Sequence, residues 1–146
     1  MKKKIIMSLL IITLIAICIS CYIINKKEQE KKEEKKAQER YAEIRENVKE
    51  AVEWNISAQF PNCVISKGFK ETLTGTFYNS KFLINNGYIK KEELLDVDNK
   101  SYCDVFVDIK PEYDNPLDHQ NNCKVYYKIY LKCKNYKDKG YEDWGR

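Results

Sequence analysis

The feature that most limits how this chain can fold is a run of 20 residues without a charged side chain, Ile5 to Ile24. Only Ser8, Thr13 and Ser20 interrupt it as clearly polar residues. At about 1.5 Å per residue, a helix of this length just crosses the roughly 30 Å hydrocarbon layer of a bilayer. We therefore expect everything after Asn25 to be attached to a membrane.

The basic N-terminus followed by an apolar run has three readings. A cleaved signal peptide needs small residues before its cleavage site, which Ala16-Ile17-Cys18 supplies poorly, and the apolar run continues to Ile24. A lipoprotein signal would attach lipid to Cys21, which follows the small residue Ser20. We expect an uncleaved anchor over residues 1–25, with lipid on Cys21 as the alternative.

Orientation depends on two opposing signals. The lysine-rich segment after the anchor would place the C-terminal part in the cytoplasm by the positive-inside bias. Four cysteines, however, lie beyond the anchor, and disulfides persist only in oxidising compartments. We therefore expect a single-pass cell-membrane protein whose C-terminal domain lies outside the cytoplasm.

Beyond the anchor the sequence predicts one helix in two parts. Residues 26–40 are almost wholly Lys, Glu, Gln and Arg, which is typical of a solvated helical stalk. Apolar residues then recur at steps of three and four, at Tyr41, Ile44, Val48, Ala51 and Val52. This stripe could join two stalks in a coiled coil, but it covers less than two heptads, so we expect it to pack on the protein's own sheet. Pro61 predicts a helix end near Ser57. Residues 41–146 then form a single domain.

Charge is distributed unevenly along the chain. Over residues 1–36 basic side chains exceed acidic ones by five, whereas from Ala37 onward acidic side chains exceed basic ones by one. A near-neutral domain lacks the basic face that a phosphate backbone requires, so nucleic acid is not expected as a partner. The basic flank suits anionic lipid headgroups, which makes the bilayer the first expected partner.

Two segments of the domain alternate apolar and polar residues, Ser101 to Lys110 and Lys124 to Cys133. We expect both to be strands with one buried face, joined by an exposed loop over 111–122. Residues 62–79 give mixed signals and are expected to form an irregular connection. A short helix, capped by Asn79 or Ser80, should end at Asn86-Gly87.

These elements predict an α+β fold. A long N-terminal helix, comprising anchor and stalk, packs its C-terminal part on a small antiparallel β-sheet, and a short second helix completes the domain.

Strand register predicts the disulfides. With Cys103 opposite Cys133, charges of opposite sign and aromatic rings meet across the strands. The pairs would be Asp104–Lys132, Val105–Leu131, Phe106–Tyr130, Val107–Ile129, Asp108–Lys128 and Ile109–Tyr127. We therefore predict a Cys103–Cys133 bridge, which leaves Cys63 for Cys123.

The sequence carries no recognisable catalytic frame. It lacks G-x-S-x-G, a Gly-rich phosphate loop and H-E-x-x-H. The single histidine, His119, lies in a polar loop near Asp114 and Asp118, without the clustered His and Cys of a zinc site or the residue order of a calcium loop. We expect no enzymatic activity, no metal and no cofactor.

Aromatic residues outside the expected core are the remaining candidates for a binding site. Tyr126 and Tyr130 lie on the strand face opposite the expected core, and Tyr136, Tyr141 and Trp144 follow. Such rings can stack on sugars or anchor a partner protein. The alternative, which we prefer, is that the tail folds back over this sheet face and forms a second small core.

The order of parts resembles type IV pilins and pseudopilins of low-GC Gram-positive bacteria over residues 41 to 133. The strings that carry this resemblance are Leu83-Ile84-Asn85-Asn86-Gly87-Tyr88-Ile89, Leu94-Leu95-Asp96, Asn99-Lys100-Ser101-Tyr102-Cys103 and Tyr127-Lys128-Ile129-Tyr130-Leu131-Lys132-Cys133. The resemblance implies a helix packed on a sheet that a late disulfide staples, and partners among pilin-like or other cell-surface proteins. The Gly-Phe type processing site of pilins and the glutamate inside their apolar segment are missing here. The resemblance therefore applies to the pilin headgroup and not to assembly into a fibre.

We therefore expect a membrane-anchored extracytoplasmic structural or interaction protein with a pilin-like headgroup. The alternative is a surface lipoprotein or anchored module that binds cell-wall polysaccharide through its aromatic residues.

Overall fold

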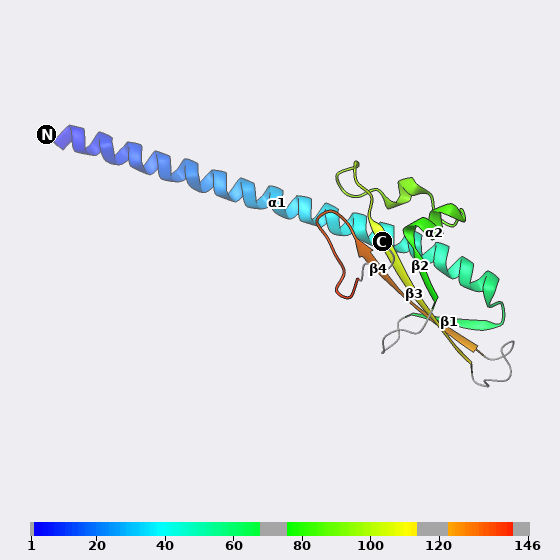
Figure 1. Ribbon diagram of the computed structural model, residues 1–146. Helices are drawn as coiled ribbons and strands as arrows, with labels where there is room; N and C mark the ends of the chain where they lie inside the picture. The colour runs from blue at the N-terminus through cyan, green and yellow to red at the C-terminus, as the bar shows by residue number, and fades with distance from the viewer. Residues whose placement is uncertain (1, 68–75, 114–122, 142–146) are drawn as a thin grey trace. The chain divides into compact units, whose positions relative to one another are not determined.

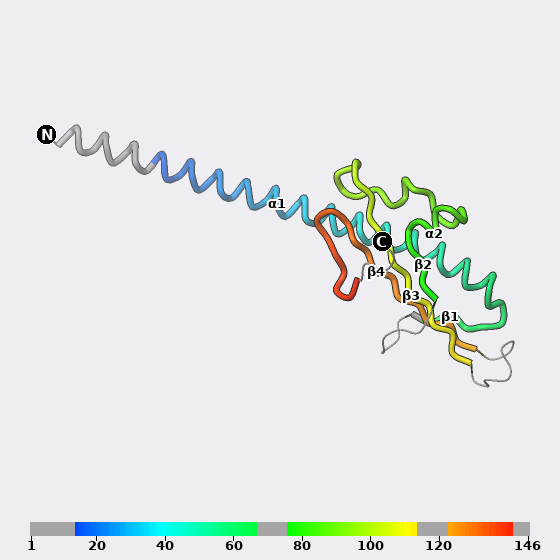
Figure 2. The backbone as a smooth tube through the Cα atoms, in the orientation of Figure 1, coloured from blue at the N-terminus to red at the C-terminus, as the bar shows by residue number. Residues whose placement is uncertain are grey.

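The computed structural model describes residues 2–67, 76–113 and 123–141, with side chains from Leu14 onward (Figure 2). Its elements are α1 (Lys2–Gln59), β1 (Cys63–Lys67), β2 (Thr76–Asn79), α2 (Ser80–Asn85), the 3₁₀ helix η1 (Lys91–Leu94), β3 (Asp104–Tyr113) and β4 (Cys123–Lys132). The predicted α+β class is confirmed. The chain forms two compact units, Met1–Glu39 and Arg40–Arg146.

The first unit consists of the N-terminal part of α1. Its described apolar side chains are exposed, from 46% at Ile23 to 69% at Tyr22. Ion pairs join Lys26 to Glu30 at 4.0 Å and Lys35 to Glu39 at 3.8 Å. Both pairs are well exposed and place Lys before Glu, the weaker order on a helix, so they add little stability.

The membrane anchor predicted at Ile5 to Ile24 is described only in part. Among the described residues, no helix has both the length and the apolar character needed to cross a bilayer. The side chains of residues 5–13, the first part of the expected anchor, lie outside the described residues.

The sheet of the second unit has the strand order β1-β4-β3-β2 (Figure 1). β3 and β4 pair antiparallel, and Asp104 lies opposite Lys132, so the predicted register is confirmed over its whole length. The expectation of an antiparallel sheet is wrong at one edge, because β1 pairs with β4 in parallel. Within the expected irregular connection, the described residues include two strands, β1 and β2. With five and four residues, both are too short to show an alternating pattern in the sequence.

β3 also runs three residues further than predicted, through Pro111 to Tyr113. Among the described strands, the pairing of β3 with β2 ends at Ile109, and Pro111 pairs with β4. A missing backbone N–H is tolerated at such an edge. The rest of the expected loop, including His119, lies outside the described residues.

The C-terminal part of α1 covers one face of the sheet (Figure 1). The predicted stripe is buried, and Asn55 and Ile56 extend it by a further turn. Opposite it, the inward-facing residues of β3 and β4 are buried, namely Val105, Val107, Ile109, Val125, Tyr127 and Leu131. The helix ends at Gln59, two residues later than expected but still before Pro61.

The other sheet face is also covered, which agrees with a tail that folds back over it, although each strand taken alone predicts one buried face. Phe106 and Asp108 are only 4% and 1% exposed. The tail contributes Tyr141, which is buried and donates its hydroxyl to Asp104 Oδ2 at 2.7 Å. A Cβ atom at Gly140 would lie 3.2 Å from Tyr130 Cε1, so this glycine lies against the ring.

Two disulfides hold the sheet, and they are the predicted pairs. Cys63–Cys123 joins the starts of β1 and β4, with 4.6 Å between Cα atoms. Cys103–Cys133 joins the residue before β3 to the residue after β4, with 4.1 Å between Cα atoms. β4 therefore has a covalent cross-link at each end.

Candidate functional site

The aromatic residues predicted to bind a partner lie in different environments. Tyr136 stacks on Tyr41 of α1 with ring centroids 4.6 Å apart, whereas Tyr141 is buried against β3. Tyr130 is half-buried next to Gly140, and Tyr126 is half-buried and is not among the lining residues of the pocket described below. Trp144 lies outside the described residues. Those that are described thus form no single exposed surface, and the contacts of Tyr141 and Gly140 agree with the alternative in which the tail covers the sheet.

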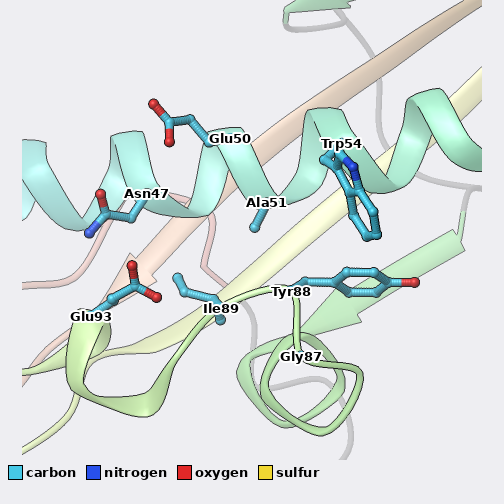
Figure 3. A pocket seen from close by; sticks show the side chains of 8 residues that line it. All are labelled: Asn47, Glu50, Ala51, Trp54, Gly87, Tyr88, Ile89 and Glu93. Atoms are coloured by element: carbon cyan, nitrogen blue, oxygen red, sulfur yellow. The ribbon is translucent and has the colours of Figure 1, made fainter.

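A pocket of about 320 Å³ lies on another side of the domain, between α1 and the segment 87–93 (Figure 3). Its lining residues are Asn47, Glu50, Ala51, Trp54, Gly87, Tyr88, Ile89 and Glu93. This volume is at the lower end of the range for small-molecule sites. The pocket joins segments about forty residues apart in sequence, so the fold alone brings them together.

Trp54 forms one wall of this pocket. It follows the buried residues Ala51 and Val52 on α1 but is itself 65% exposed, because it lies beside the apolar stripe and not within it. Its ring meets Tyr88 edge-on, with centroids 5.4 Å apart and planes at 60° (Figure 3). An exposed tryptophan beside a tyrosine is typical of binding surfaces. Sequence analysis missed Trp54, although a tryptophan outside a helix's apolar stripe was the available signal.

The turn after α2 places Tyr88 at the pocket. Asn79 caps the start of α2 by accepting from the Phe82 N–H at 2.8 Å. At the other end Gly87 has a φ of +71°, the left-handed conformation that favours glycine, and the Tyr88 N–H donates to the Leu83 carbonyl at 2.9 Å. This turn directs the Tyr88 ring toward α1. The buried residue Ile89, which follows it, lines the pocket.

Two carboxylates give the pocket its charge. Glu93 accepts a hydrogen bond from the Lys90 N–H at 2.6 Å, which caps η1 and holds the carboxylate opposite Asn47 (Figure 3). Glu50 is an exposed lining residue whose carboxylate points away from the two rings (Figure 3). None of the eight lining residues is basic. The site therefore combines two aromatic rings with the Glu93 carboxylate, and Glu50 adds a second negative charge on the exposed side of α1.

A second cluster contains metal-ligand atoms that are already engaged. Asp96, Cys103 and Cys133 bring a carboxylate oxygen and two sulfurs within 4.8 Å of one another. Both sulfurs belong to the disulfide. The Asp96 carboxylate accepts from the Val97 and Lys134 N–H groups at 2.6 and 2.9 Å. This carboxylate joins the segment between η1 and β3 to Lys134, after β4, which is a structural role.

Comparison of the chain with protein-family models, curated proteins and solved structures found no match.

Proposed function

We propose that this protein is a membrane-tethered interaction module whose disulfide-stapled α+β domain is displayed outside the cytoplasm. The observation that carries the proposal is the pair of disulfides at the two ends of β4. Structural disulfides persist in oxidising spaces and are rare in the cytosol. The pilin-like headgroup resemblance agrees with a role in contacts at the cell surface, without a polymer.

The first unit supports the tether. Apolar side chains from Leu14 to Ile24 are exposed on every side of the helix. A helix that is apolar all round is normally buried in a large core or in lipid. The charge-free run begins further upstream, at Ile5, so lipid is the proposed environment of this segment. Cys21 is exposed and free, and lipid attachment there remains the alternative mode of tethering.

Thiol labelling of intact cells tests the location of the domain. In a Cys18→Ser, Cys21→Ser variant, the remaining cysteines are the four in the two disulfides. We expect no labelling by a membrane-impermeant maleimide until an impermeant reductant is added, and then labelling without lysis. A cytoplasmic reporter protein with an exposed cysteine is the control. Labelling that requires lysis would refute the outward location.

The same variant separates the two modes of tethering. If the helix itself is the anchor, the protein should stay in the membrane fraction after alkaline carbonate extraction. Release of the variant, with retention of the unaltered chain, would instead assign the tether to lipid on Cys21.

A further inference from the structure

We infer that the pocket between α1 and residues 87–93 binds an alkylammonium group. This inference rests on the proposed function, because it gives the interaction module a class of ligand. The group could belong to a free amine or to a lysine side chain, and both offer the same cationic head on an aliphatic stem.

The aromatic rings of the pocket provide the first argument. A cation held over the face of a tryptophan or tyrosine within about 6 Å of the centroid is attracted by the ring quadrupole, and tryptophan is the strongest partner. Trp54 meets Tyr88 edge-on, so the two rings present surfaces at 60° to each other. Two walls of this kind can contact the methylene or methyl groups of one ammonium ion.

The charge of the pocket provides the second argument. Among the eight described lining residues, Glu93 and Glu50 are the charged ones, and both are acidic. Two lysines close in sequence to the lining residues are engaged elsewhere: Lys49 pairs with Glu46, and the Lys91 ammonium lies 4.5 Å from the Tyr102 ring centroid. An anionic ligand would be repelled by these carboxylates. A neutral sugar could donate hydroxyl hydrogen bonds to them, but it would not gain the attraction between unlike charges. A cation complements both the rings and the carboxylates.

The domain uses the same chemistry internally. Lys91 lies over Tyr102, and Lys128 lies over Tyr130 at 4.9 Å. Within the described ranges 14–67, 76–113 and 123–141, no lysine lies over Trp54 or Tyr88. Tyr102 and Tyr130 thus already have a lysine of the same chain over their rings. The rings of Trp54 and Tyr88 could accept a cation from a ligand in the same way.

Fluorescence titration of the full chain provides the test. The chain has two tryptophans, so Trp144→Phe leaves Trp54 as the only reporter. The protein is kept in a polyoxyethylene detergent, which carries neither a sugar nor an ammonium group. We expect a saturable change in Trp54 emission with tetramethylammonium chloride or with Nα-acetyl-lysine amide, and none with sodium chloride at equal ionic strength. The amine with the tighter binding identifies the source, a quaternary amine or a lysine side chain.

Matched variants locate the binding. Glu93→Gln keeps the cap on the Lys90 N–H, because glutamine also accepts there, but removes the charge. With Glu50→Gln added, binding should weaken about tenfold, the loss expected when a partly desolvated cation loses its counter-charges. Glu92→Gln, the neighbouring carboxylate outside the pocket, should leave binding unchanged. Trp54→Ala, followed by calorimetry, should abolish it while both disulfides and the circular dichroism spectrum are retained.

Three results would overturn the inference. These are an absent response to both amines, an equal loss in Glu92→Gln, or a saturable response to N-acetylglucosamine oligosaccharides in place of the amines. The last would assign the pocket to a sugar. Thiol labelling reports location independently of this titration, so an outward domain that binds no amine would reject only the ligand.

Discussion

Asp108 is a buried carboxylate in the middle of β3 for which no described residue donates a hydrogen bond to either oxygen. Burial raises the pKa of this group, and the positive charges of Lys128 and Lys110 only partly oppose the shift. An unpaired buried charge is costly, so Asp108 weakens the sheet when it is ionised.

Replacing Asp108 by asparagine should stabilise the protein at neutral pH, by about 1 kcal/mol, because the cost of burying a charge is removed. The folded-state pKa is raised, so the stability linked to this group is fully present below the unfolded pKa of about 3.9 and is lost as pH rises through the folded pKa. The gain of Asp108→Asn should therefore shrink on acidification. Urea unfolding at pH 7 and pH 4 measures it, with Glu112→Gln as an exposed control on the same strand. A gain that does not change with pH would contradict this account.

Asp138 has the opposite behaviour. Burial alone would raise the pKa of its carboxyl, but hydrogen bonds from the Tyr136 hydroxyl, the Leu131 N–H and Arg45 hold the pKa below its ordinary value. The Arg45 guanidinium contacts both carboxylate oxygens, at 3.0 and 2.8 Å, and also donates to the Ile129 carbonyl at 3.0 Å. One carboxylate thus links α1, β4 and the tail.

Asp138→Asn should destabilise the domain by about 2 kcal/mol, the range for hydrogen bonds to a charged group. Because the folded-state pKa is lowered, this stability is present above the unfolded pKa of about 3.9 and is lost as pH falls through the folded pKa. Urea unfolding midpoints of both proteins should therefore converge at low pH. Lys139→Gln, an exposed neighbour, serves as the control, and a difference that persists in acid would argue against the charge as the cause.

Among the elements, β4 depends most on covalent links. Cys103–Cys133 spans 30 residues and Cys63–Cys123 spans 60. In the chain-entropy model, Cys103→Ser with Cys133→Ser should cost about 3.5 kcal/mol, and Cys63→Ser with Cys123→Ser slightly more, about 4 kcal/mol. Denaturant unfolding of both double variants measures these losses.

Peptide mapping of the unreduced chain is the control for this experiment. It should yield only the two native linkages. A Cys63 peptide joined to Cys103 or Cys133 would contradict the register on which the comparison rests.

β3 and β4 were predictable from sequence because their charges, rings and thiols agree in only one register. β1 was not, because its partner in parallel is separated from it by sixty residues and its own five residues carry no periodic signal. The burial of Asp108 was missed for a related reason. The polar residues of an alternating strand predict an exposed face, and the sequence does not show which distant segment covers that face. The pocket at Trp54 was missed because its two walls converge only in the fold.

At the scale of the whole molecule, the two units differ in what stabilises them. In Met1–Glu39 the described side chains are largely exposed, whereas from Tyr41 to Ile56 the helix buries a full stripe. Exposed helices rely on local propensity, while packed helices share the stability of the domain.

Amide hydrogen exchange should therefore be much faster in residues 26–39 than in residues 44–56, although both are helical. Mass-spectrometric exchange of the full chain in detergent measures this. Peptides from β4 provide the slow reference, since that strand lies inside the sheet. Equal protection of the two segments would show that another contact covers the stalk.

The cross-links at both ends of β4 change how the chain responds to pulling and cutting. Tension applied between α1 and the tail passes from Cys63 directly to Cys123 and along β4 to Cys133, so the backbone of residues 64–122 carries no load. At about 3.4 Å per residue, the Cys63–Cys123 disulfide therefore prevents the extension of roughly 200 Å of chain. A single proteolytic cut anywhere between Cys63 and Cys133 likewise releases no fragment, because every piece remains bonded to the rest. The second unit can therefore be cut once within this range and still stay covalently joined to α1.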